Sequence, residues 1–161
     1  MPAGVVVRTA CVTTNGDLWI GTAGDGLFRQ RGDAVVQFTE RAGLSGNTVE
    51  VVWPDALGGV WIGTRNGGLN SITRGVIHRV NTPWGFTGNY ASCLAEATNG
   101  DLWIGTTGDG LFQFRAGRFV TDGWATNLPS GNVRSLCAAV DGVIWVGTSR
   151  GLCRLKDGAI S

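Results

Sequence analysis

One short segment occurs four times at a constant spacing, and it limits the possible folds more than any other feature of the sequence. The segment reads Gly-Asp-Leu-Trp-Ile-Gly-Thr at residues 16–22, and its tryptophan returns every 42 residues, at Trp19, Trp61, Trp103 and Trp145. A fixed period of this size is typical of proteins built from stacked structural repeats. Each segment is apolar at consecutive positions, which indicates a β-strand that is covered on both faces.

Glycine-containing pairs precede each Trp segment and predict tight turns. These pairs are Asn15-Gly16, Gly58-Gly59, Asn99-Gly100 and Asp141-Gly142. Such pairs tolerate the positive φ that a hairpin turn requires. The chain holds 27 glycines together with 43% apolar residues, a combination that suits many short strands joined by turns. No stretch has the sustained periodicity of a capped helix.

Four short antiparallel strands fit into each repeat of 42 residues, which predicts an all-β fold made of β-propeller blades. The Trp segment is the second strand of each blade, counted from the propeller axis. The expected blades cover approximately residues 5–46, 47–88, 89–131 and 132–161. Together they form either a single propeller domain or half of one.

The repeat also carries the pattern of a known family. Asn47-Thr48-Val49, the Trp segment, Gly67-Gly68-Leu69 and Leu128-Pro129-Ser130 follow an order that resembles the two-component regulator propeller repeat. The resemblance covers nearly the whole chain. It implies a sensor propeller of the kind that membrane-spanning hybrid kinases carry in the periplasm, often for carbohydrate sensing. The chain departs from that pattern because it has four repeats rather than about seven, and neither a membrane segment nor a kinase.

The number of blades leaves three possible arrangements: a closed four-bladed ring, half of a larger ring completed by a second copy, or a fragment. An arc of four blades would expose an apolar face at each end. We therefore expect a homodimer in which two chains complete one eight-bladed ring about a two-fold axis. The N-terminal residues lack the basic start and the long apolar core of a signal peptide.

Charge and cysteine patterns argue against several other classes of protein. Thirteen basic and twelve acidic residues nearly cancel, and they form no block of like charge, so no nucleic-acid partner is expected. No apolar run reaches the length of a membrane helix. The cysteines lack Cys-x-x-Cys spacing and align with apolar positions, so we expect small buried hydrophobic residues rather than metal ligands. They are Cys11, Cys93, Cys137 and Cys153.

No set of residues points to catalysis, a cofactor or a metal. His78 is the only histidine, and it falls on an expected outermost strand without a paired nucleophile. Asp25 and Asp109 lie in Gly-Asp-Gly turns that supply one oxygen ligand each, too few for a calcium loop. The threonine that ends each Trp segment is expected to form a structural hydrogen bond (Thr22, Thr64, Thr106 and Thr148). We therefore expect a protein without enzyme activity.

The candidate site rests on positions at which the repeats differ. The inner-strand column Arg8, Glu50, Ser92 and Ser135 is polar among apolar neighbours and is expected to face the central channel. The return loops carry two unrepeated aromatic residues, and Tyr90 and Arg134 begin the inner strands that follow. Such residues on loops of a rigid scaffold are typical of recognition sites. We predict a ligand site formed by Trp84, Trp124, Tyr90, Arg134, Arg8 and Glu50. The alternative is that the two tryptophans pack against their own loops.

The expected function is non-catalytic ligand recognition in a sensor. A carbohydrate would suit the predicted site, because flat sugar rings stack on aromatic side chains while arginine and glutamate supply directed hydrogen bonds. A protein-interaction scaffold is one alternative. A hydrolase or lyase similar to the streptogramin-lyase propellers is less well supported, because those proteins use a histidine-based acid–base pair and a metal.

Overall fold

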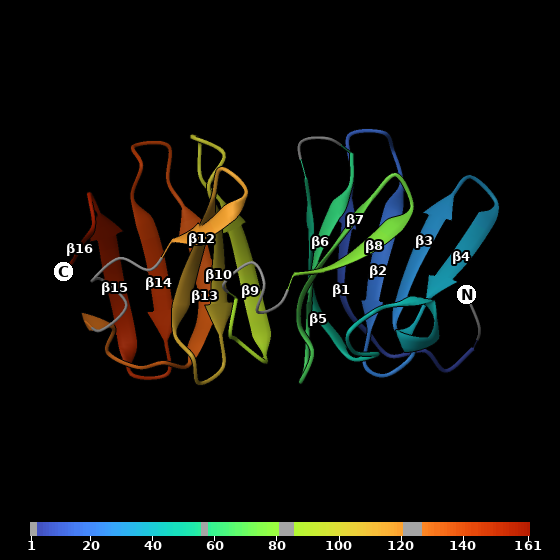
Figure 1. Cartoon of the computed structure of the whole chain (residues 1–161), viewed down its shortest axis with the longest axis horizontal. Helices are drawn as coiled ribbons and strands as arrows, with labels where there is room; N and C mark the ends of the chain where they lie inside the picture. Colours follow the sequence, from blue (N-terminus) through green and yellow to red (C-terminus); the bar gives the residue numbers. More distant parts are fainter. Residues whose placement is uncertain (1–2, 56–57, 81–85, 121–126) are drawn as a thin grey trace.

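The computed structural model describes residues 3–55, 58–80, 86–120 and 127–161, and it contains four antiparallel sheets of four strands each (Figure 1). The strands of each sheet are ordered as they follow one another along the chain. This architecture confirms the predicted all-β class of propeller blades. A short 3-10 turn, η1 (Glu40–Ala42), lies between the first two sheets.

The strands of the four blades have the following bounds. Blade 1 consists of β1 (Val7–Val12), β2 (Leu18–Thr22), β3 (Leu27–Arg31) and β4 (Ala34–Phe38). Blade 2 consists of β5 (Val49–Pro54), β6 (Val60–Thr64), β7 (Gly68–Thr73) and β8 (Val76–Val80). Blade 3 consists of β9 (Ala91–Glu96), β10 (Leu102–Thr106), β11 (Leu111–Arg115) and β12 (Arg118–Val120). Blade 4 consists of β13 (Val133–Ala138), β14 (Ile144–Thr148), β15 (Gly151–Lys156) and β16 (Ala159–Ile160).

The blades stand side by side in an open row, with blade 1 and blade 4 at opposite ends of the molecule (Figure 1). The first strand of each blade packs against the first strand of the next, so that β1 contacts β5, β5 contacts β9 and β9 contacts β13. These are the inner strands of a propeller arc. The strands that carry the repeated tryptophans come second from this inner row, as the sequence predicts. The described residues do not form a closed four-bladed ring.

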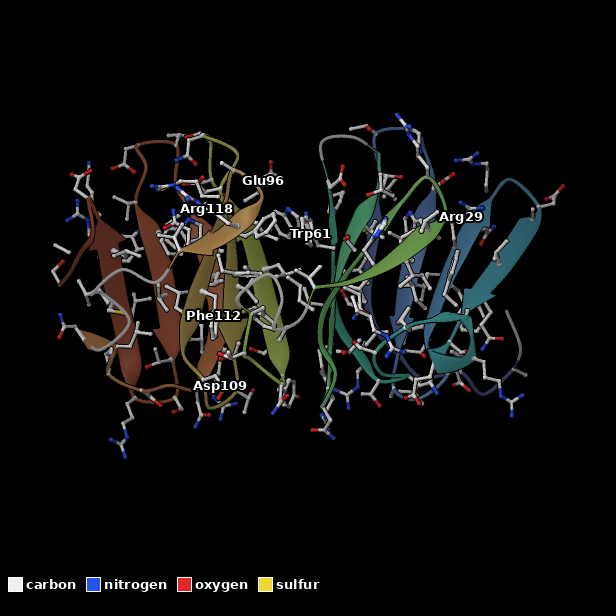
Figure 2. The ribbon with its side chains drawn as sticks, in the orientation of Figure 1. Arg29, Trp61, Glu96, Asp109, Phe112 and Arg118 are labelled. Carbon is white, nitrogen blue, oxygen red and sulfur yellow. The ribbon has the colours of Figure 1, made fainter. Side chains whose placement is uncertain are left out.

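The hydrophobic core consists of three layers, one between each pair of neighbouring blades. Trp19 is only 2% exposed and packs in the same cluster as Ile62 of blade 2. Trp61 projects from blade 2 toward blade 3 (Figure 2), where its ring centroid lies 5.3 Å from that of Phe114. Trp103 fills the layer between blades 3 and 4. These three tryptophans are therefore blade-packing residues, as predicted.

The glycine that follows each Trp-Ile or Trp-Val pair permits the close approach of the next blade. A Cβ atom added at Gly21 would lie 2.5 Å from Val49 Cγ1, and one at Gly105 would lie 2.6 Å from Val133 Cγ1. In both cases one clashing atom belongs to the inner strand of the following blade and another to the inner strand of the same blade, Thr9 or Cys93. The same glycine in blade 4, Gly147, meets only the side chain and backbone of Ser135 in its own sheet. The repeated glycine is therefore required where two blades meet.

The last blade presents an apolar face that no described residue of the chain covers. Trp145 is 39% exposed and Leu152 is 68% exposed, although Trp145 occupies the same strand position as the buried Trp19. Cys137 pairs with Trp145 across the β13–β14 ladder and is exposed as well. The expectation that all four cysteines are buried is therefore wrong for Cys137, because no described residue packs over this face of blade 4. The other three are buried or half-buried.

Blades 1 and 3 are closely matched in sequence. Residues 14–28 and residues 98–112 are the same at every position except one, where Ala23 stands in the first segment and Thr107 in the second. Both segments form the hairpin turn, the Trp strand and the start of the third strand of their blade. Blades 2 and 4 have different residues at many of these positions. The local sequence therefore repeats most closely between blades 1 and 3.

Candidate functional site

Each inner strand begins with a β-bulge, and one polar residue per blade lies in it. The register between the inner strand and the Trp strand shifts between Val7 and Thr9 in blade 1 and between Val49 and Val51 in blade 2. Equivalent shifts occur in blades 3 and 4. The residues inside the four bulges are Arg8, Glu50, Ser92 and Arg134. A residue in a bulge has no partner in the ladder, so its side chain can be directed away from the sheet.

This register corrects the predicted inner-strand column in its last member. Ser135 pairs with Gly147 within the ladder and lies one position beyond the bulge. Arg134 holds the bulge position in blade 4, at the same spacing of 42 residues that separates Arg8, Glu50 and Ser92. The error arose because the return loop before blade 4 is longer, which displaced the alignment of the inner strands by one residue.

Three blades contribute to one polar network at the start of the inner strands, which we call the mouth end. Arg8 Nη1 donates a hydrogen bond of 2.9 Å to Glu50 Oε2, and Arg65 Nε donates one of 2.9 Å to Glu50 Oε1. Arg65 Nη2 also donates to the hydroxyl of Tyr90 at 3.0 Å. Its guanidinium lies 5.2 Å from the centroid of the Tyr90 ring. Each carboxylate oxygen of Glu50 therefore binds a different arginine.

The electrostatics of this network hold both arginines in place. The side chain of Glu50 is only 10% exposed, while those of Arg8 and Arg65 are 35% and 42% exposed. The hydrogen bonds to Tyr90 and then to Glu50 raise the pKa of Arg65, which therefore stays charged at any physiological pH. The network presents the Tyr90 ring and the edges of two arginines at the mouth end, while the carboxylate between the arginines is mostly buried.

The structure brings together part of the predicted site. Arg8, Glu50 and Tyr90 lie in one network, and Arg134 lies exposed at the matching position of blade 4, outside the network. Trp84 and Trp124 lie outside the described residues, so their role stays a prediction. Ser92 does not join the network, because its hydroxyl donates to the backbone oxygens of Val133 and Gly105. It therefore connects blades 3 and 4.

Arg65 is the residue of this network that the sequence analysis missed. It follows the Trp strand β6 directly, at a turn position where the other blades have Ala23, Thr107 and Ser149. The signal was its departure from the repeat: only blade 2 has a charged side chain here. The turn brings it beside the inner strand of its own blade and that of the next, so it reaches both Glu50 and Tyr90.

Other candidate positions have structural roles. The threonine that ends each Trp strand donates a hydrogen bond of 2.7–3.1 Å to a glycine oxygen across the following turn, which confirms the prediction (Thr22, Thr64, Thr106 and Thr148). Among the described residues no cluster of histidine, cysteine or acidic side chains could hold a metal ion. His78 lies exposed on β8, the outermost strand of blade 2.

Burial lowers the acidity of three cysteine thiols. Burial raises the pKa of Cys11 and of Cys93 to about 11, and it also raises that of Cys153. These thiols are therefore poor nucleophiles at neutral pH, because the thiolate is the reactive form.

In the described part of the chain, no helix is long and apolar enough to cross a membrane.

Comparison with solved structures assigns the fold to the β-propellers. The chain is similar to the extracellular domain of BT3049 from B. thetaiotaomicron, described as a hybrid two component system, with a TM-score of 0.80 and 24% identity over 94% of the chain. It is also similar to that of BT4673 from the same organism, described as a one component system, with a TM-score of 0.80 and 18% identity over 100% of the chain. Virginiamycin B lyase from Staphylococcus aureus with quinupristin has a TM-score of 0.74 and 18% identity over 98%.

Two of the repeats match a known family model. Residues 85–108 and 127–150 match the family model described as two component regulator propeller. These two matches fall in the third and fourth repeats and confirm the resemblance seen in the Trp segments. No curated protein matches the sequence. The chain spans 22% and 25% of the two B. thetaiotaomicron proteins and 55% of the lyase.

Proposed function

We propose that this chain is the ligand-recognition part of a sensor, with a non-catalytic binding site at the mouth end of the inner strands. The observation that carries the proposal is the network of Arg8, Glu50, Arg65 and Tyr90, in which unlike residues of three similar blades meet. The match of two repeats to the two component regulator propeller model and the likeness to the extracellular domain of a hybrid two component system support it. Recognition residues on a rigid repeated scaffold are a common way to build a binding site.

A carbohydrate is the ligand class that this site suits best. The network offers the Tyr90 ring, its hydroxyl and the guanidinium N–H donors of two arginines within one small area. Sugar hydroxyls both donate and accept hydrogen bonds, so they can use donors and acceptors that lie side by side. Sugar rings also present flat apolar faces that pack on aromatic side chains.

The test is a glycan array followed by calorimetry on the intact chain. We expect Arg65→Ala and Tyr90→Ala to weaken binding by about 1–3 kcal/mol each, as anchor residues do, with little change in unfolding temperature. Trp84→Ala and Trp124→Ala are expected to behave in the same way. Trp61→Ala should instead destabilise the fold by about 3–5 kcal/mol, because it removes a packed aromatic ring. Unchanged affinity in Arg65→Ala would contradict the site.

Two other functions remain as alternatives. A protein-interaction scaffold would use the same exposed mouth end, and it would be favoured if the array gave no ligand while a protein partner bound at Arg65. A lyase or hydrolase has less support. His78, the only histidine of the chain, lies on β8 at the outer edge of blade 2 and not at the mouth end.

We also propose that a second copy of the chain completes an eight-bladed ring. The exposed face of blade 4 has the residue types that pack against a following blade elsewhere in this chain. In such a ring, blade 4 of each copy would pack against blade 1 of the other, in a head-to-tail contact that closes after two steps. Each copy would then contribute its mouth end to one shared ring.

A further inference from the structure

A second polar site lies between blades 1 and 2, at the opposite end of the sheets from the mouth. It is a groove of about 420 Å³ beside the β1–β2, β3–β4 and β7–β8 hairpins. Asp17, Trp19, Arg29, Arg31, Ile72 and Arg74 are among the residues that line it. Three of these side chains are arginines and one is a carboxylate, so the lining carries a net charge of +2. We call it the hairpin groove.

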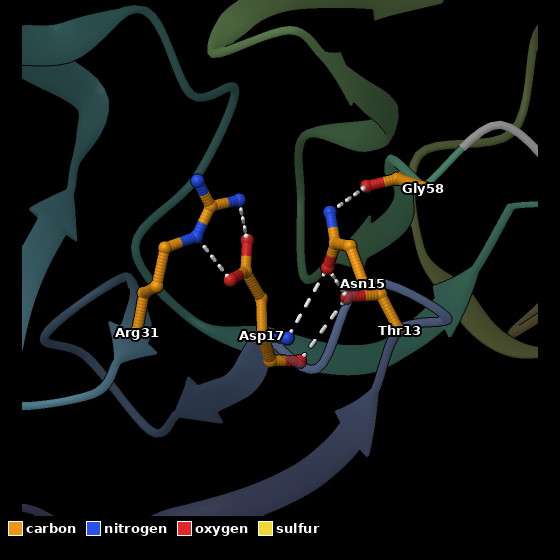
Figure 3. A network of polar contacts seen from close by, with 5 residues as sticks. All are labelled: Thr13, Asn15, Asp17, Arg31 and Gly58. Atoms are coloured by element: carbon orange, nitrogen blue, oxygen red, sulfur yellow. Dashed lines mark hydrogen bonds and ion pairs between the residues drawn. The ribbon is translucent and has the colours of Figure 1, made fainter.

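The one carboxylate of the hairpin groove, that of Asp17, already forms an ion pair with Arg31 through both of its oxygens. Arg31 donates from Nε to Asp17 Oδ1 at 2.5 Å and from Nη2 to Asp17 Oδ2 at 2.7 Å (Figure 3). The side chain of Asn15 accepts a hydrogen bond from the backbone N–H of Asp17 and donates one to the backbone oxygen of Gly58 in blade 2. The hydrogen bond from Arg31 lowers the pKa of Asp17, whose side chain is only 1% exposed. Asp17 and Arg31 therefore neutralise each other and leave two arginines.

These two arginines come from different blades and form no ion pair within the described part of the chain. The Arg29 guanidinium lies 5.6 Å from the centroid of the Trp19 ring. A guanidinium held in this way keeps its edge N–H groups available for an acceptor. Arg74 is exposed at the tip of the β7–β8 hairpin, where its φ of 52° fixes it in the left-handed region. The groove thus offers cationic donors from two sides.

The corresponding grooves of the same chain have different charges. Between blades 3 and 4, Gln113 replaces Arg29 and Asp157 replaces Arg74, and the acidic residues balance Arg115 and Lys156. Between blades 2 and 3, the charged residues of the groove below the hairpins are Asp55 and Glu96. The same scaffold therefore carries a net charge of +2, −2 and 0 in its three grooves. The positive charge of the hairpin groove therefore comes from residues particular to blades 1 and 2, and not from positions that all the blades share.

We propose that the hairpin groove binds the anionic group of a small molecule: a carboxylate, a sulfate or a phosphate. Planar guanidinium groups bind such oxygens with two parallel hydrogen bonds, and these charge-assisted bonds are stronger than neutral ones. The groove is separate from the site at the mouth end, so it can be tested whether or not that site binds a carbohydrate.

The test is a titration of the whole chain with acetate, sulfate and phosphate at constant ionic strength, followed by NMR of the arginine and indole N–H groups. We expect saturable shifts of Arg29, Arg74 and Trp19. Arg29→Gln and Arg74→Asp should each weaken the binding at least about tenfold, since a charge-assisted hydrogen bond contributes more than 1.4 kcal/mol. Both variants introduce residues that this chain already uses at the matching positions of blades 3 and 4. Arg118→Gln, on the outer strand β12, is the matched control.

The reverse exchange gives an independent test. Gln113→Arg combined with Asp157→Arg should create saturable anion binding between blades 3 and 4. The relative affinities for the three anions identify the preferred group, and a preference for any of them supports the proposal. Shifts without saturation in the wild type, or equal affinities in Arg29→Gln, Arg74→Asp and Arg118→Gln, would overturn it. Circular dichroism of each variant confirms that the blades have formed.

Discussion

At the scale of single residues, the aspartate before the Trp strand distinguishes two kinds of blade. Asp17 in blade 1 and Asp101 in blade 3 are buried, and each forms an ion pair with the arginine opposite it, Arg31 or Arg115. Blades 2 and 4 have Gly59 and Val143 at this position. A buried carboxylate without its arginine would be strongly destabilising. The two residues therefore have to be present or absent together.

This pairing predicts how stability changes with pH. The pKa of Asp17 is lowered in the folded state. The stabilisation that its carboxylate contributes is therefore fully present above the unfolded-state pKa of about 4. It is lost as the pH falls through the folded pKa. We expect Asp17→Asn to lower the melting temperature at neutral pH, and the difference from the wild type to shrink in acid. Thermal melts by circular dichroism from acid to neutral pH measure the difference in melting temperature between the two proteins. A difference that stays constant with pH would contradict the role given to the Asp17–Arg31 ion pair.

At the scale of the strand, the repeated glycine of the Trp segment permits neighbouring inner strands to pack closely. At Gly105 an added Cβ would lie 2.5 Å from Cys93 Sγ and 2.6 Å from Val133 Cγ1, and the second of these atoms belongs to the next blade. At Gly147 its nearest neighbour would be Ser135 Oγ, the end of a short side chain that can rotate away. The same substitution should therefore have different effects at these two positions.

We expect Gly105→Ala to destabilise the fold by about 1–3 kcal/mol, as overpacking in a core does. Gly147→Ala should cost much less, because its only close neighbour is Ser135 of its own sheet, whose side chain can rotate away. Urea unfolding, at a protein concentration that keeps the chain monomeric, gives both values. A loss of stability at Gly147 as large as that at Gly105 would show that the face of blade 4 is not open.

Most of this strand-level structure could be predicted from the sequence. The Asn15-Gly16 turn, the apolar Trp strand and the Thr22 hydrogen bond depend on local chemistry that repeats at every blade, so their signals reinforce one another. Arg65 could not be predicted in the same way, because its partners Glu50 and Tyr90 belong to two blades. The mistaken assignment of Ser135 has a similar cause: a bulge fixes the register, and no residue type identifies this bulge.

At the scale of the whole molecule, the open row of blades leads to a prediction of the oligomeric state. The chain has a mass of 16.9 kDa, and we expect light scattering to give a dimer, because two apolar end faces are otherwise left in water. Leu152→Arg should reduce the dimer to the monomer, since it places a charge in the contact. Arg118→Gln, outside the end faces, should leave it intact. A monomeric mass for the wild type would refute the eight-bladed ring.

The exposed thiol of Cys137 supplies a second measurement of the same assembly. Cys137 lies on the face of blade 4 that would become buried when the ring closes. Its reaction with a thiol reagent should therefore slow as the protein concentration rises, whereas in Leu152→Arg the rate should not depend on concentration. A rate independent of concentration in the wild type would contradict closure at this face.

The close match between blades 1 and 3 has a consequence for how the chain reaches its fold. Residues 14–28 and 98–112 differ at one position, so before the blades are assembled each segment can pair with the neighbours of the other at almost the same energy. Such competition is a known source of kinetic traps and domain exchange in repeat proteins. The residues that distinguish the two blades include Ala23 and Arg29 in blade 1 and Thr107 and Gln113 in blade 3. Correct refolding therefore depends on these few differences, which favour the native position of each blade.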